Sequence, residues 1–272
     1  MTAVSALGAA ATLVASAFAL CTGERWLRRR RPHEAAWTQA LLMFALGSLA
    51  YWWAGAVGWN TANFRAFYLF GAILNVPYLA VGTIFLLRGR AAGRRVHLGV
   101  HLLAAFCAGA VLTAPTRAPI PPTGLPEGRE VFGVGPRVMA AVGSGVGATV
   151  LIVGALWSAG GLIRGRRRTG GRGPRAADAG SGLSPVRLVV TNVAIAVGSL
   201  VLGAGGTFFT GSAQEVGFGI LLVTGIVILF GGFLVTPPAV VEAPAPPPGL
   251  DAFAAELWTI AHAPVAPARP TD

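Results

Sequence analysis

Asn75, Pro77 and Tyr78 place polar groups and a helix-breaking residue inside an otherwise apolar stretch. No charged residue lies between positions 66 and 87, a length that lets an α-helix cross about 30 Å of hydrocarbon. In lipid the Asn75 amide needs a protein or water partner, and Pro77 removes the backbone hydrogen bond to the carbonyl of Ile73. We predict that Asn75 and Tyr78 bind a small solute near the membrane midplane and that Pro77 is a hinge.

Asn192 supplies a second amide in a later apolar segment, and we predict that it belongs to the same solute site. Polar side chains inside membrane helices often mark the path of a solute. A structural explanation competes with this one, because an Asn can also join two helices through a hydrogen bond worth about 1 kcal/mol. The residue types leave both explanations open.

His97 and His101 are four residues apart, so both imidazoles lie on one face of a helix and form a weak candidate metal site. The sequence offers no third ligand at matching depth, and Cys21 and Glu34 are the nearest candidates. The alternative places His97 at the membrane interface and bonds His101 to a neighbouring helix. We therefore predict neither a metal nor a cofactor.

Arg65 and Glu215 each open an apolar segment on the same predicted side of the membrane. This placement predicts an ion pair across the outer face of a helical bundle. The alternative is that both charges are solvated at the interface, where an exposed pair contributes little to stability.

The residue types exclude several kinds of chemistry. All 21 basic residues are Arg, so the chain lacks the Lys of a P-loop and the Lys that carries retinal in a Schiff base. None of the ten acidic residues lies in the middle of an apolar segment, which disfavours proton-coupled transport and intramembrane proteolysis. No catalytic motif is present, and the sequence favours a protein without enzymatic activity.

The composition predicts a membrane protein, because 54% of the residues are hydrophobic and only 11% are charged. A soluble domain has about a quarter of its residues charged. We predict an all-α bundle of seven transmembrane helices that occupies residues 1–238. The predicted spans are residues 4–21, 37–57, 66–87, 96–114, 138–163, 186–206 and 216–235.

The distribution of Arg predicts the orientation of this bundle. Seventeen of the 21 lie in the segments after the first, third and fifth spans, at Arg187 or in the tail, and only four lie on the other side. The positive-inside rule then puts the N-terminus outside and the C-terminus in the cytoplasm, in a bacterial-type plasma membrane that the chain crosses many times.

Glycines predict close helix packing, and low-complexity segments predict contacts with partners. Gly143 and Gly147 form a GxxxG motif that lets helix backbones approach closely. Residues 239–272 form a Pro/Ala-rich tail, with a predicted short amphipathic helix at 249–262. The basic loop 164–187 and this tail are the predicted contacts for a protein partner, the lipid bilayer is the other partner, and no nucleic acid is expected. The oligomeric state cannot be predicted.

Three functions remain compatible with these features. The first is a non-enzymatic sensor, scaffold or regulatory protein that acts through its cytoplasmic segments. The second is a transporter or channel for a small neutral or weakly polar solute, which uses Asn75 and Asn192. The third, the least supported, is a redox membrane protein that depends on His97 or His101. A polar cavity at the midplane would favour the second, and a bound haem would favour the third.

Overall fold

The computed structural model describes residues 2–168, 190, 193–194, 197–202, 213–234 and 254. These residues are almost entirely helical, and no strand occurs in the described ranges. The helices are α1 (Ala3–Arg29), α2 (Pro32–Val57), α3 (Thr61–Ala66), the π-helix η1 (Phe67–Leu74), α4 (Asn75–Thr113), α5 (Gly128–Val131), α6 (Val134–Arg168) and α8 (Gln214–Leu234).

Five helical stretches of the described chain are long and apolar enough to cross a membrane: Ala3–Arg29, Pro32–Val57, Thr61–Thr113, Val134–Trp157 and Gln214–Leu234. The stretch Thr61–Thr113 joins α3, η1 and α4, and it covers two of the predicted spans. The predicted sixth span, 186–206, lies mostly outside the described residues, and so does the predicted tail helix 249–262, of which only residue 254 is described. The all-α class therefore agrees with the prediction, whereas the number of seven helices and the orientation remain predictions.

The chain reverses within α4 at Gly89, which adopts φ 79° and ψ −178°. A positive φ is costly for any residue with a Cβ atom, so glycine suits this turn. The sequence predicts a loop from residue 88 to 95 between two spans, but the helix continues on both sides of this single glycine. Within the helical stretch Thr61–Thr113, the part before Gly89 (with α3 and η1) and the part after it each exceed the roughly 20 residues that a membrane span needs.

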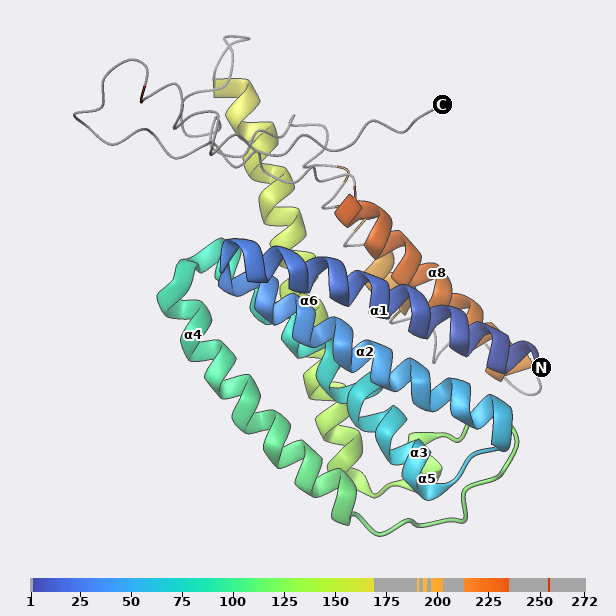
Figure 1. Ribbon diagram of the computed structural model, residues 1–272. Helices are drawn as coiled ribbons and strands as arrows, with labels where there is room; N and C mark the ends of the chain where they lie inside the picture. Colours follow the sequence, from blue (N-terminus) through green and yellow to red (C-terminus); the bar gives the residue numbers. More distant parts are fainter. Residues whose placement is uncertain are drawn as a thin grey trace, which may run out of the picture.

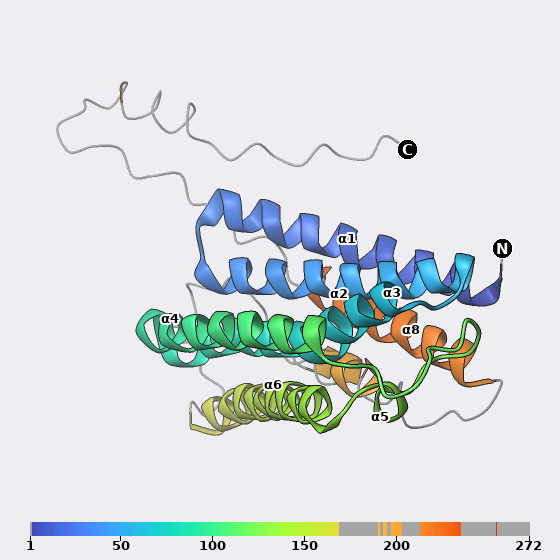
Figure 2. The same cartoon turned by 90° about the horizontal axis from the view of Figure 1, so that it is seen from below.

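The α1–α2 turn lies at the same end of the molecule as the Gly89 turn, and α3 and α5 lie at the opposite end (Figures 1 and 2). We call the first the arginine end and the second the α5 end. Arg30 turns the chain with a left-handed backbone (φ 50°), and Pro32 begins α2 at a position that suits its fixed φ. All four arginines of the opposite predicted side, Arg65, Arg117, Arg129 and Arg137, belong to the α5 end.

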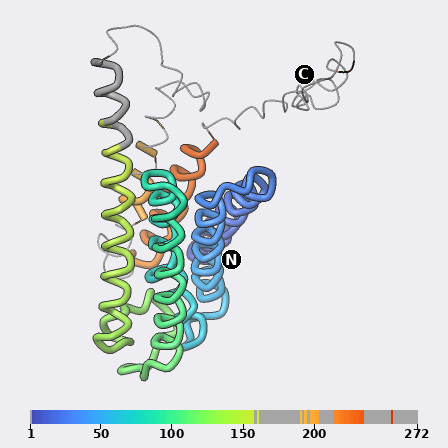
Figure 3. Tube along the Cα trace, turned by 90° about the vertical axis from the view of Figure 1, so that its left-hand side faces the viewer, coloured from blue at the N-terminus to red at the C-terminus, as the bar shows by residue number. Residues whose placement is uncertain are grey.

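The helices stack in layers, with α8 against α1, α1 against α2, α2 against α4, and α4 against α6. Figure 2 shows α1, α2, α4 and α6 in this order, and Figure 3 shows α6 and α1 on opposite sides of α4. Sequence neighbours are therefore mostly spatial neighbours. The main apolar core lies near the α5 end, around Tyr51, Phe64, Ile73 and Phe132, each at most 1% exposed.

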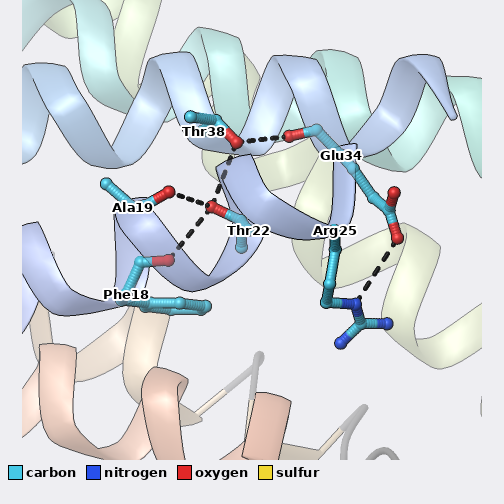
Figure 4. Close-up of polar contacts among 6 residues, drawn as sticks. All are labelled: Phe18, Ala19, Thr22, Arg25, Glu34 and Thr38. Carbon is cyan, nitrogen blue, oxygen red and sulfur yellow. Dashed lines mark hydrogen bonds and ion pairs between the residues drawn. The ribbon is translucent and has the colours of Figure 1, made fainter. Parts of the chain in front are cut away.

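Two polar contacts join α1 to α2 near the arginine end (Figure 4). The Thr38 hydroxyl donates to Thr22 Oγ1 over 3.1 Å, and Thr22 itself donates to carbonyls of its own helix. Arg25 Nε lies 3.5 Å from Glu34 Oε1, and the Glu34 side chain is only 2% exposed. Since a buried carboxylate needs a compensating charge, Arg25 and Glu34 fix how α1 packs on α2.

Candidate ligand-binding cavity

A cavity of about 890 Å³ lies between α2, η1, α4, α6 and α8. This volume is within the range of roughly 300–1,000 Å³ that small-molecule sites occupy. Aromatic and aliphatic side chains form most of its wall, among them Phe44, Phe67, Phe218, Leu79 and Leu222. The cavity is therefore large enough for a small organic ligand and mostly apolar.

Three residues on the wall carry a buried oxygen that has no hydrogen-bond partner in the described structure. They are Ser48 on α2, Asn75 at the start of α4, and Ser199 in the described segment 197–202. Ser48 and Asn75 are 1% and 5% exposed. An unsatisfied buried polar group costs about 1–3 kcal/mol, so a bound group that hydrogen-bonds to these oxygens would stabilise the structure.

The π-helix η1 and Pro77 shape the wall next to Asn75. In the wider turns of a π-helix the carbonyl of Ala72 would accept from residue 77, which is a proline and has no N–H. The Ser144 hydroxyl of α6 donates to this carbonyl instead. A side chain of the neighbouring helix thus compensates for the missing backbone donor.

The GxxxG motif of α6 packs against the same irregular segment. A Cβ atom on Gly143 would lie 3.0 Å from the carbonyl oxygen of Ile73, the acceptor that Pro77 deprives of its α-helical donor. A Cβ atom on Gly147 would lie 2.9 Å from Cγ1 of Val76 and 3.1 Å from the nitrogen of Pro77. The motif therefore brings helices together within the bundle, and it does so beside the cavity.

Charged residues line the cavity only at the α5 end. Glu127 and Arg129 form an ion pair with each other, and Arg137 lies at the start of α6. Deeper in the cavity the polar groups among the described residues are the uncharged Ser48, Asn75, Ser144 and Ser199. The lining at the arginine end includes none of the described arginines. The cavity thus reaches from a charged mouth at the α5 end to a neutral interior.

The predicted solute-binding residues do not all meet. Asn75 lines the cavity, together with Val76 and Leu79. Tyr78 is buried elsewhere, with its ring edge-on to His97 and His101 at centroid distances of 6.0 and 5.3 Å. Asn192 lies outside the described residues. Pro77, the predicted hinge, is buried beneath Gly147 of α6 and lies in the first turn of α4, three residues after the end of the π-helix.

The two histidines form hydrogen bonds to protein atoms. His97 Nε2 donates to Oε1 of Gln39 on α2 over 2.8 Å, and His101 Nδ1 donates to the carbonyl of His97 over 2.8 Å. The centroids of the two imidazole rings are 4.4 Å apart. Within the described ranges, no group of three His, Cys, Asp or Glu could hold a metal ion. The alternative to a metal site predicted that His101 bonds to a neighbouring helix. In the structure His97 makes such a bond, to Gln39 of α2, and His101 does not.

Arg65 and Glu215 have other partners than each other among the described residues. The Arg65 guanidinium donates to the carbonyls of Leu112 and Ala114, over 2.5 and 2.7 Å, and ties α3 to the end of α4. The Glu215 carboxylate accepts from Trp59 Nε1 over 3.1 Å. No ion pair between Arg65 and Glu215 occurs in the described part of the chain, where three other ion pairs are formed.

The sequence reasoning missed Ser48, Ser144 and Ser199. Single serines are common in membrane helices, where the hydroxyl usually bonds to a carbonyl of its own helix, as Thr12 does with Gly8. Ser144 stands inside the predicted GxxxG motif, directly after Gly143, but that motif predicts helix packing and no role for a hydroxyl. Nothing in the sequence distinguishes the serines that face a cavity from those that bond locally.

These helices and their apolar composition fit an integral membrane protein. A comparison with protein-family models, with curated proteins and with solved structures finds no match to this chain. Any assignment of function therefore has to come from the cavity and its residues.

Proposed function

We propose that this protein binds a small neutral ligand in the Asn75 cavity and acts as a membrane sensor. The observation that supports the proposal is the coincidence of a cavity of about 890 Å³ with three unpartnered buried oxygens, on Ser48, Asn75 and Ser199. The α5 end, which the positive-inside rule places outside the cell, is the route of entry. Bound ligand would then change how α4 and α6 pack against each other, and these two helices extend to the cytoplasmic end.

The wall chemistry indicates what the ligand is. Its body is apolar, because aromatic and aliphatic residues form most of the lining. It carries at least one hydrogen-bond donor, because the Asn75 Oδ1 atom is an acceptor without a partner. It is uncharged, because the interior offers no charged side chain to compensate a buried ion. Alcohols and amides of modest size meet these conditions.

Transport of the same ligand is the second candidate function, and the π-helix next to Pro77 supports it. Irregular turns and proline kinks in membrane helices mark places where a helix can bend. Such a bend between Leu74 and Pro77 would move Asn75 relative to α6. A transporter would use it to open the cavity towards the arginine end, whereas a sensor would not.

The substitution Asn75→Leu separates binding from packing. We expect this variant to melt at or above the wild-type temperature in detergent, because it removes an unsatisfied buried amide oxygen. Benzyl alcohol, cyclohexanol and benzamide serve as probes, each with a donor on an apolar body. We expect at least one to raise the melting temperature of the wild type and to bind the variant about tenfold more weakly, a loss of about 1.4 kcal/mol.

The matched control is Asn63→Leu, because the Asn63 amide is fully engaged. Its Nδ2 donates to Gly58 over 3.0 Å, and its Oδ1 accepts from the Asn60 N–H over 2.8 Å. This variant should melt lower than the wild type. If Asn75→Leu lowers the melting temperature as much as the control, Asn75 is structural. If no probe stabilises the wild type, the proposed binding function is wrong.

A further inference from the structure

A second, smaller cavity lies at the arginine end, far from Asn75 along the helices. Its volume is about 260 Å³, and it is lined by Arg30, Pro32, Phe85, Arg90 and Arg94. This is less than the roughly 300 Å³ at which drug-sized sites begin, so it suits a compact group rather than a whole lipid. Three of its five lining residues are arginines.

The local fold brings these three arginines together from two separate turns. Arg30 has a left-handed backbone at the α1–α2 turn. Arg90 and Arg94 follow the Gly89 turn and stand one helical turn apart on one face of the returning arm. Gly93 lets this arm approach Phe85 closely, because a Cβ atom there would overlap the Phe85 ring. The two turns of the backbone therefore bring these three arginines to one cavity.

No carboxylate of the described chain balances these three charges. The described turns at this end carry two acidic residues, and both are engaged, Glu24 with Arg28 and Glu34 with Arg25. Arg30 stacks over the Trp26 ring at 5.7 Å, a contact that leaves its charge uncompensated. Nine arginines belong to the same two turns: Arg25, Arg28, Arg29, Arg30, Arg31, Arg88, Arg90, Arg94 and Arg95.

We propose that the Arg30–Arg90–Arg94 cavity is a binding site for a phosphate group. The three arginines are exposed to solvent around one small cavity, so their guanidinium groups are free to bind an anion with several oxygens, and Arg matches the geometry of phosphate through paired N–H donors. The phosphate is that of an anionic phospholipid headgroup or a free phosphate ion. Basic pockets between membrane helices on the cytoplasmic side commonly hold such headgroups.

Exposed apolar residues next to the cavity suit a lipid source. Leu86 and Leu98 are 53% and 63% exposed on the two arms that meet at Gly89. These side chains would lie against acyl chains while the phosphate occupies the cavity. A free phosphate ion would gain nothing from them.

The test titrates the purified full-length protein in detergent with three probes. These are dihexanoyl phosphatidylglycerol, dihexanoyl phosphatidylcholine, and sodium phosphate against sodium chloride at matched ionic strength. The test variant is Arg90→Gln/Arg94→Gln. The control is Arg88→Gln/Arg95→Gln, which removes the same charge from the same turn but from residues that do not line the cavity. Arg30→Gln is the independent second variant, from the other turn.

We expect the test variant to bind its anion about 30-fold more weakly, since each Arg contributes about 1 kcal/mol, while the control binds within a factor of about three. Preference for phosphatidylglycerol over both other probes assigns the site to an anionic lipid headgroup. Binding of inorganic phosphate at least as tightly assigns it to free phosphate. The proposal is wrong if neither anion binds the wild type, or if the test and control variants lose equal affinity.

Discussion

Arg25→Met is expected to destabilise the protein more than any other single substitution discussed here. It leaves the Glu34 carboxylate, 2% exposed, without its cation (Figure 4). Neither Glu34 oxygen has a hydrogen-bond partner in the described structure, so no hydrogen bond there would replace the ion pair. Removing one partner of a buried pair costs about 3–5 kcal/mol, and the partial exposure of Arg25 puts this case near 3 kcal/mol. The measurement is thermal unfolding in detergent.

The complementary substitutions make this prediction specific. Glu34→Gln should cost less, because Arg25 keeps access to water and a contact 4.5 Å above the Phe233 ring. The double variant Arg25→Met/Glu34→Met should recover most of the loss, since two apolar groups replace a desolvated pair. A double variant less stable than Arg25→Met alone would show that the ion pair is not what holds α1 on α2.

Gly147→Leu is expected to have the second-largest effect, because it forces α6 away from the segment that carries Asn75. A Cβ atom at this position already lies within 3.1 Å of Val76 and Pro77 atoms, two of which belong to the backbone. Overpacking of this kind costs about 1–3 kcal/mol. We expect insertion into the membrane to persist and the melting temperature in detergent to fall.

Gly145→Leu is the matched control, two residues away on the same helix. A Cβ atom there meets nothing within 4 Å, yet Gly145 lines the large cavity. This variant should melt like the wild type and bind the alcohol and amide probes less well, because its side chain occupies part of the cavity. Equal melting temperatures for both glycine variants would mean that the GxxxG contact does not support the bundle.

The sequence predicted the helices well because their signal is long and strong. Runs of about 20 apolar residues, the arginine groups and the GxxxG motif each carry information that one chain reveals by itself. The reversal at Gly89 was harder, because a predicted loop of eight residues, 88–95, contracts to a single turn that only the left-handed backbone of a glycine allows.

Side-chain partners were predicted less well, for a physical reason. Arg65 donates to two backbone carbonyls, and a carbonyl acceptor leaves no trace in the residue types. Tyr78 stands three residues after Asn75, but the helix face that lines the cavity carries Asn75, Val76 and Leu79. The Tyr78 ring lies off this face and packs against His101 on the returning arm of α4. A shared helical turn was therefore a poor guide to a shared site.

Water access at the depth of Asn75 tests the central claim, that a ligand cavity reaches from the α5 end into the bundle. Gly147 packs against Val76 and Pro77, so Ala148, which lines the cavity, lies at this depth. Val146, 59% exposed on the same helix, does not line it. Each becomes Cys in a background with Cys21→Ala and Cys107→Ala, which remove the native thiols. A small, uncharged, hydrophilic methanethiosulfonate should modify the Ala148→Cys variant and spare Val146→Cys in membranes. An unreactive Ala148→Cys variant would contradict the cavity and the function proposed for it.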